Sequence, residues 1–130
     1  MAGTLVIDTL KSSTTSPPAF QNTSGTEIGT LCRAWVNFDG TGTVAIRASF
    51  NVTSITDLGT GQYTVNFTNS MPDANYSAIV TGGPNNSSVG GIFGEAACYN
   101  TISISAVRIA FIVHSGSIVD DPYCFVSIFR

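Results

Sequence analysis

Alternation of apolar and polar residues dominates the chain from residue 31 onward. The segments "CRAWVNF" (32–38) and "QYTVNFT" (62–68) place an apolar side chain at every second position, as a half-buried β-strand does. Between them, "TVAIRASFNVTSI" (43–55) is rich in β-branched residues, which favour strands. We therefore predict an antiparallel meander of about four strands across residues 31–68.

Two glycine-containing turns punctuate this region, "DGTG" at 39–42 and "DLGTG" at 57–61. Asp and Gly tolerate the positive φ of tight hairpin loops, and the second glycine of each turn can host a bulge. Each turn leads into a predicted strand and neither carries a lysine. A phosphate-binding loop, which needs a lysine and a following helix, is therefore excluded.

The second half of the chain also reads as short strands. "YSAIVTG" (76–82) predicts a strand, and "GPNNSSVGG" (83–91) predicts a loop. In "TISISAVRIAFIVHS" (101–115) the apolar positions change parity near Ala106, which predicts a bulge or a bend. The final "YCFVSIF" is apolar on both faces, so we expect it to be a central strand or to meet a neighbour with its outer face.

No segment shows a sustained helical period, so the fold class that we predict is all-β: an antiparallel, jelly-roll-like β-sandwich over residues 31–130. Residues 1–30 differ, because they are rich in Ser, Thr, Pro and Gly and contain the pair Pro17-Pro18. Such a segment cannot bury enough apolar area to fold by itself. We predict an extended N-terminal attachment arm.

Charge is scarce in this chain. Charged residues make up 10% of the 130 residues, and hydrophobic residues make up 43%, whereas typical domains are about 25% charged. A surface short of charge predicts self-association, although a monomer with a hydroxyl-rich surface remains an alternative. The net charge of -3 argues against nucleic-acid binding. The chain shows neither a membrane-spanning apolar run nor a secretory signal, which predicts synthesis in a cytosol without membrane insertion.

Few residues of this chain suit catalysis or metal binding. The chain has one histidine, His114, at the end of an apolar segment, and four of its eight acidic residues fall in turns. We predict that the protein is not an enzyme and binds no cofactor or metal. Asp120-Asp121 could offer oxygens to Ca²⁺, but their spacing is that of a turn before Pro122. Three cysteines suggest buried thiols, or one disulfide with one free thiol.

The segment "AWVNFDGTGTVAIRASFNVTSITDLGTGQYTVNFTNSMPDANYS" (34–77) resembles a segment of tail-fibre and other virion proteins of double-stranded DNA bacteriophages, cyanophages among them. Short members of this group also begin with an arm like "GTLVIDTLKSS" and end with a strand like "FVSIFR". The resemblance implies a homotrimeric β-rich module that is displayed on the virion, after synthesis in the host cytoplasm. It implies anchoring to other virion proteins through the N-terminal arm and loops that are free to touch the host.

Two functions fit this resemblance: a short tail fibre or receptor-binding protein that contacts a host-surface glycan or protein, and a capsid decoration protein that cements the head. An enzyme such as a depolymerase is a third possibility, which glycan release by the isolated protein would support. Because loops on a rigid scaffold often carry binding, we name as candidate receptor contacts Asn85, Asn86, Ser87, Ser88, Tyr99, Asp120, Asp121 and Tyr123. The candidate residues for attachment to the virion are Leu5, Val6, Ile7, Leu10, Pro17, Pro18 and Phe20.

Overall fold

The computed structural model describes residues 3, 6–13, 18–83, 94–113 and 116–130, with the side chains of 94–100 left out of the description. The chain divides into two compact units, Met1–Leu31 and Cys32–Arg130. The first unit contains one short antiparallel hairpin, formed by β1 (Phe20–Gln21) and β2 (Glu27–Gly29). Its turn is closed by the Asn22 side chain, whose Oδ1 accepts from the backbone N–H groups of Ser24 and Thr26.

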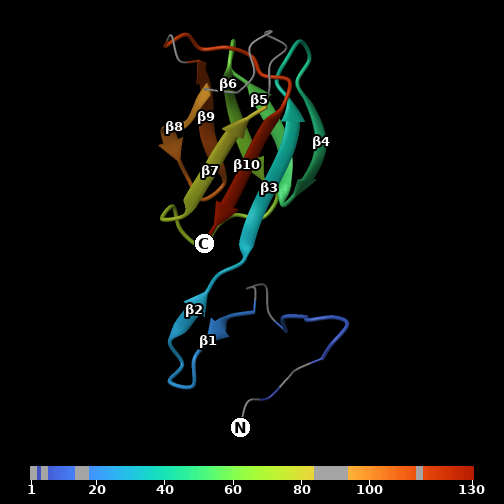
Figure 1. The fold of residues 1–130 in the computed structure, drawn as a ribbon, viewed down its shortest axis with the longest axis vertical. Coiled ribbons are helices and arrows are strands. Elements are labelled where there is room, and N and C mark those ends of the chain that lie inside the picture. The colour runs from blue at the N-terminus through green and yellow to red at the C-terminus, as the bar shows by residue number, and fades with distance from the viewer. Residues whose placement is uncertain (1–2, 4–5, 14–17, 84–93, 114–115) are drawn as a thin grey trace. The chain divides into compact units, whose positions relative to one another are not determined.

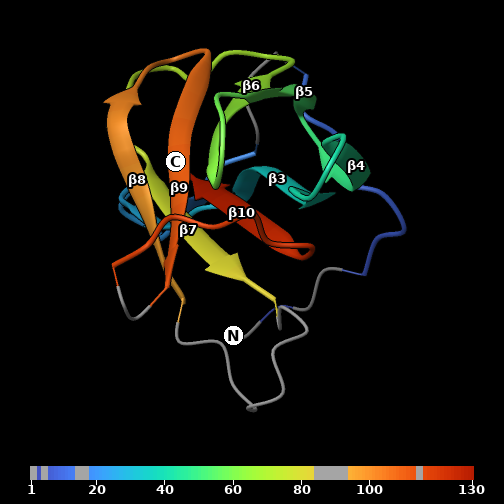
Figure 2. The same cartoon turned by 90° about the horizontal axis from the view of Figure 1, so that it is seen from above.

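The second unit is a sandwich of two four-stranded antiparallel sheets (Figures 1 and 2), which confirms the predicted all-β sandwich. One sheet has the strand order β4-β3-β10-β7 and the other β5-β6-β9-β8. The strands are β3 (Cys32–Asp39), β4 (Ala45–Phe50), β5 (Val52–Asp57), β6 (Gln62–Phe67), β7 (Ser77–Gly82), β8 (Gly94–Ile102), β9 (Ala106–Val113) and β10 (Cys124–Phe129).

The core lies between the two sheets and follows the alternation that the sequence shows. On β3 the buried residues are Ala34, Val36 and Phe38, and on β6 they are Tyr63, Val65 and Phe67. Three aromatic rings, those of Phe38, Tyr63 and Phe111, contact one another edge-on near one end of the core, with centroids 5.2 to 6.5 Å apart. Such contacts add stability beyond the apolar area that they bury.

The predicted meander over residues 31–68 is wrong in one respect. Its four strands exist, but β3 and β4 pair in one sheet while β5 and β6 pair in the other. The chain changes sheets at Asn51, which has a φ of 55° and is the only non-glycine with positive φ among the described residues. The Asn51 side chain supports this corner by accepting from the Asn69 N–H at 2.7 Å and donating to the Arg33 carbonyl at 3.0 Å.

Two further expectations can be checked in the C-terminal half. The last strand, β10, lies between β3 and β7, which confirms the prediction of a central strand. The parity change near Ala106 is a tight turn that joins β8 to β9, closed by the Ser103 N–H donating to the Ala106 carbonyl at 2.9 Å. The cysteines Cys32 and Cys124 are both free thiols, and Cys124 is fully buried in the core.

Candidate functional site

One end of the sandwich is built from three loop segments that the backbone ties together. We call it the loop end, defined by the turns 39–42 and 57–61 and the segment 118–123. The Gly40 N–H donates to the Asp121 carbonyl at 2.9 Å, and the Gly61 N–H donates to Asp120 Oδ1 at 2.6 Å. These bonds join turns from both sheets to one segment, so the loop end is a single connected structure.

Two glycines, Gly40 and Gly61, allow the close backbone contacts of the loop end. Gly61, which directly precedes β6, has a φ of +62°, and a Cβ there would meet the Val119 backbone oxygen at 2.5 Å. Gly40 is similarly enclosed, since its Cβ would meet the Tyr63 hydroxyl at 2.5 Å. Only a residue without a side chain lets these backbones approach so closely.

A buried tyrosine links the core to this end. The Tyr63 ring is fully buried, and its hydroxyl lies 2.8 Å from the Gly40 carbonyl and 2.9 Å from Asp120 Oδ1. Burial, together with the neighbouring Asp120 carboxylate, raises the pKa of this phenol. Tyr63 therefore acts as a neutral group that fixes the positions of Gly40 and Asp120.

Asp121 is the one buried charged or polar residue of the described core, at 5% exposure. Its Oδ1 accepts from the Tyr123 N–H at 2.7 Å, and its carbonyl accepts from the Gly40 N–H and the Cys124 thiol. Burial raises the pKa of the Asp121 carboxyl, while the N–H groups of Tyr123 and Gly83 lower it. Its carboxylate therefore accepts from backbone N–H groups and holds the loop in place. A receptor contact by Asp121 remains a prediction.

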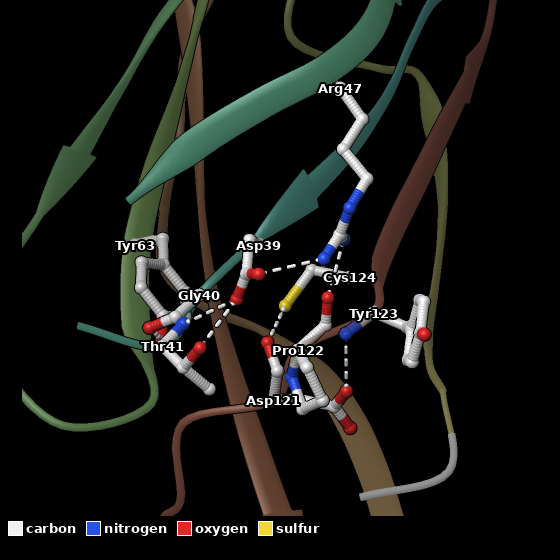
Figure 3. Close-up of polar contacts among 9 residues, drawn as sticks. All are labelled: Asp39, Gly40, Thr41, Arg47, Tyr63, Asp121, Pro122, Tyr123 and Cys124. Carbon is white, nitrogen blue, oxygen red and sulfur yellow. Dashed lines mark hydrogen bonds and ion pairs between the residues drawn. The ribbon is translucent and has the colours of Figure 1, made fainter. Parts of the chain in front are cut away.

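The exposed part of the loop end is a cluster of three side chains from three strands or strand ends (Figure 3): Asp39, Arg47 and Tyr123. Arg47 Nη2 donates to Asp39 Oδ2 at 2.7 Å, and Arg47 Nη1 donates to the Pro122 carbonyl. The Arg47 guanidinium carbon lies 4.9 Å from the centroid of the Tyr123 ring, which is a cation–π geometry.

Both partners of this ion pair are about one-third exposed, so solvent screens much of its energy. The pKa of Asp39 is lowered chiefly by its hydrogen bonds from Thr41 and, to a smaller extent, by Arg47. The cluster therefore contributes orientation more than stability. It holds the Tyr123 ring, which is 43% exposed, in one position at the surface.

The structure brings together only part of the predicted receptor site. Asp120, Asp121 and Tyr123 all lie at the loop end. Asn85, Asn86, Ser87 and Ser88 fall outside the described residues, and the side chain of Tyr99 is not described although its backbone belongs to β8. Sequence reasoning missed Asp39, Arg47 and Tyr63, and the one available signal was that Arg47 is the lone charge in a run of β-formers.

The predicted attachment residues lie in the first unit. Val6, Ile7, Leu10 and Phe20 are all exposed, from 43% to 87%. Pro18 is half-buried, whereas Leu5 and Pro17 lie outside the described residues. Ile28 on β2, which sequence reasoning did not select, is also 68% exposed.

Two kinds of site are not found among the described residues. No three His, Cys, Asp or Glu side chains in that part of the chain gather closely enough to hold a metal ion. A helix with the length and apolar character to span a membrane is likewise not found there.

Comparison with known proteins gives one similar fold. No protein-family model matches the sequence, and no curated protein matches it significantly. Among solved structures, the chain is similar to the phiAB6 tailspike in complex with three-repeated oligosaccharides of Acinetobacter baumannii surface polysaccharide, at 16% identity and a TM-score of 0.49. The similarity covers 98% of this chain and 30% of the tailspike chain, so this chain spans less than a third of that protein's length. No residue role is transferred from a likeness at this level.

The prediction that the protein is not an enzyme is contradicted by this comparison, because the similar structure is a tailspike with bound oligosaccharides. Glycoside hydrolysis requires only two suitably placed carboxyl groups, and a chain with eight acidic residues does not lack them. That prediction is withdrawn, and no catalytic residue is assigned among the described side chains.

Proposed function

We propose that this protein is a short tail-fibre or receptor-binding module of a bacteriophage virion, displayed as a homotrimer, which binds a host-surface glycan through its loop end. Asp120 and Tyr123 are the contact residues that we assign, supported in position by Arg47 and Tyr63. The proposal rests on the resemblance of residues 34–77 to phage virion proteins and on the geometry of the loop end.

One observation carries the glycan-binding part: the Tyr123 ring is exposed and yet held from several sides. Arg47 contacts the ring, the Tyr123 N–H donates to Asp121, and the Tyr123 carbonyl accepts from the Gly83 N–H at 2.6 Å. An aromatic ring that is already ordered loses little entropy when a sugar stacks on it. The nearby carboxylates of Asp39 and Asp120 are acceptors for sugar hydroxyl groups.

The path of the chain through the sandwich supports display of this end. The first unit ends at Leu31, and β3 begins at Cys32 and reaches the loop end at Asp39. Eight residues of extended strand span about 26 Å. Cys32, the first residue after the first unit, therefore lies at the end of β3 opposite to the loop end.

The first unit has the surface that attachment requires. Its exposed apolar side chains, such as Val6 at 87% and Ile28 at 68%, cost free energy in water and gain it when another protein covers them. We assign this unit to contact with another virion protein.

The test is binding of the purified full chain to an immobilised panel of bacterial lipopolysaccharides and capsular polysaccharides. We expect Tyr123→Ala to weaken binding about tenfold, because a stacked aromatic is worth roughly 1.4 kcal/mol. Ile104→Ala, at an exposed residue of the β8–β9 turn, is the matched control and should bind like the parent chain. Equal binding by the Tyr123→Ala chain and the parent chain would refute the assignment of the loop end. An assay for reducing ends released in the same mixtures tests whether the protein cleaves the polysaccharide.

A capsid decoration role is the second candidate, and the exposed apolar residues of the first unit favour it equally, since they would also dock on a capsid protein. Copy number separates the two functions. Tens of copies per virion or fewer indicate a tail component, whereas hundreds of copies indicate decoration of the head.

A further inference from the structure

The outward side of the sheet β4-β3-β10-β7 carries an unusual number of apolar side chains. We call it the outer face. Strand register places Phe50, Trp35, Ser127 and Ile79 in one row across all four strands. Phe125 and Asn37 lie opposite each other in the next row. The four large apolar residues are between 38% and 55% exposed, with Phe50 and Ile79 the most open.

Strand β4 adds a second observation. All six of its residues are exposed, although the strand includes Ile46 and Phe50. Among the described residues β4 pairs only with β3, so its other edge is not paired. An exposed edge strand with apolar side chains is normally covered or interrupted by charges in a soluble protein. Here the one charge, Arg47, is already engaged by Asp39.

We infer that the outer face, together with β4, is the surface through which copies of this chain pack against one another. A second copy fits because the face is neutral. Between the Asp39–Arg47 pair at one margin and Arg33 at the other, no described residue of this face is charged. A charged partner would lose hydration here without gaining a counter-charge, whereas another copy presents the same combination of apolar rings, hydroxyl groups and an amide.

The flat footprint of this surface is about half of the area that one partner buries in a stable interface. Four strands spaced by about 4.8 Å and six residues rising about 3.4 Å each give a footprint of roughly 400 Å². Projecting side chains and the exposed sides of β4 enlarge the accessible area beyond this footprint, toward the roughly 800 Å² per partner of a stable interface. In a cyclic trimer, a face turned toward the axis contacts both other copies. The number three rests on the proposed function; the position of the interface rests on the face itself.

Trp35 makes this inference directly testable, because it is the only tryptophan of the chain and lies in the middle of the outer face. The full chain is measured by light scattering and by tryptophan emission with acrylamide quenching, over a dilution series. We expect the mass of three chains at high concentration with a blue-shifted, poorly quenched Trp35. On dilution, loss of mass and increased quenching should occur together.

Two substitutions on the face and two controls complete the experiment. Phe50→Lys and Ile79→Lys should reduce the mass to that of one chain and expose Trp35, with an unchanged far-ultraviolet circular dichroism spectrum. Leu58→Lys and Ile104→Lys, at exposed residues in turns, should keep the parent mass. The inference would be overturned if the parent chain had the mass of one chain at every concentration. It would also be overturned if both face variants kept the mass of three chains while acrylamide quenched Trp35 strongly.

Failure of this inference can be told from failure of the proposed function. If a single chain still binds polysaccharide and loses that binding on Tyr123→Ala, the loop-end function stands and only the interface is wrong. If the interface is confirmed while no polysaccharide binds, the interface stands and the loop-end function is wrong.

Discussion

Strands β4 and β6 have the same length and similar sequence character but very different surroundings. Both are six residues long and follow a glycine-containing turn. In β6, which lies between β5 and β9, every second residue is buried, whereas in β4, at a sheet edge, every residue is exposed. The difference teaches that a strand-forming sequence does not by itself determine burial. The elements packed around a strand determine its burial. For β4 we infer that some of these elements belong to other copies of the chain.

The largest expected effect is a difference in stability between alanine variants of the two phenylalanines that end these strands. Phe67 of β6 is 8% exposed and contacts Tyr76 edge-on at 5.9 Å, whereas Phe50 of β4 is 55% exposed. We expect Phe67→Ala to lower the free energy of unfolding by about 3 to 5 kcal/mol. Phe50→Ala should lower it by less than about 1 kcal/mol when the chains are dissociated. Urea unfolding at low protein concentration measures both, and equal losses would contradict the contrast.

The glycines before the two strands provide the next comparison. Gly61, before β6, is enclosed by the Val119 backbone and Ile118, whereas a Cβ on Gly42, before β4, would meet nothing within 4 Å. Both have positive φ, so each substitution by alanine costs about 1 kcal/mol of backbone strain. We expect Gly42→Ala to lose only this amount and Gly61→Ala to lose clearly more in thermal unfolding. Equal losses would mean that the loop end adjusts freely.

A smaller effect is expected at the hydroxyl group that joins β6 to the loop end. Tyr63→Phe removes the bonds to the Gly40 carbonyl and to Asp120 but leaves the ring in the core. We expect a loss of about 1 to 2 kcal/mol, because the buried Gly40 carbonyl loses a hydrogen-bond donor. Urea unfolding gives this value, and polysaccharide binding should weaken with it, because Asp120 keeps only the hydrogen bond from the Gly61 N–H. Unchanged stability would show that Tyr63 contributes only its ring.

The smallest effect concerns the ion pair of β4. The pKa of Asp39 is lowered below its ordinary 3.8, so its carboxylate stabilises the fold above that pH, and the stabilisation is lost as the pH falls through the lowered pKa. We expect Asp39→Asn to lower the urea midpoint slightly at neutral pH. The difference from the parent chain should disappear well below pH 3.8. A difference that persists in strong acid would assign the effect to packing instead of charge.

Much of the fold could be predicted from alternation and turn residues, because these report local geometry. The strands around residues 32–38 and 62–68, and the central position of the last strand, follow from side chains that must face a core. The change of sheets at Asn51 could not be predicted in the same way. The alternation continues through "SFNV" without interruption, and only the positive φ of one residue turns the strand into the other sheet.

The loop end was less accessible to sequence reasoning. Asp120 and Tyr123 were selected because they lie in a loop. Arg47 belongs to a strand and reaches Tyr123 only through the pairing of β4 with β3 and of β3 with β10. The alternation of residues 62–68 placed Tyr63 on the core face of its strand. Nothing in the sequence indicated that its hydroxyl group would contact Gly40 and Asp120. Tertiary contacts of this kind depend on register, which alternation does not specify.

Amide hydrogen exchange along β4 and β6, measured over a range of protein concentrations, tests the central claim that copies of the chain complete the outer face. The account predicts that β6 amides are protected at all concentrations. Amides of residues 45–50 that are not bonded to β3 should become protected only as the chains assemble. Exchange along β4 that is independent of concentration, in a sample whose mass changes with concentration, would contradict the claim.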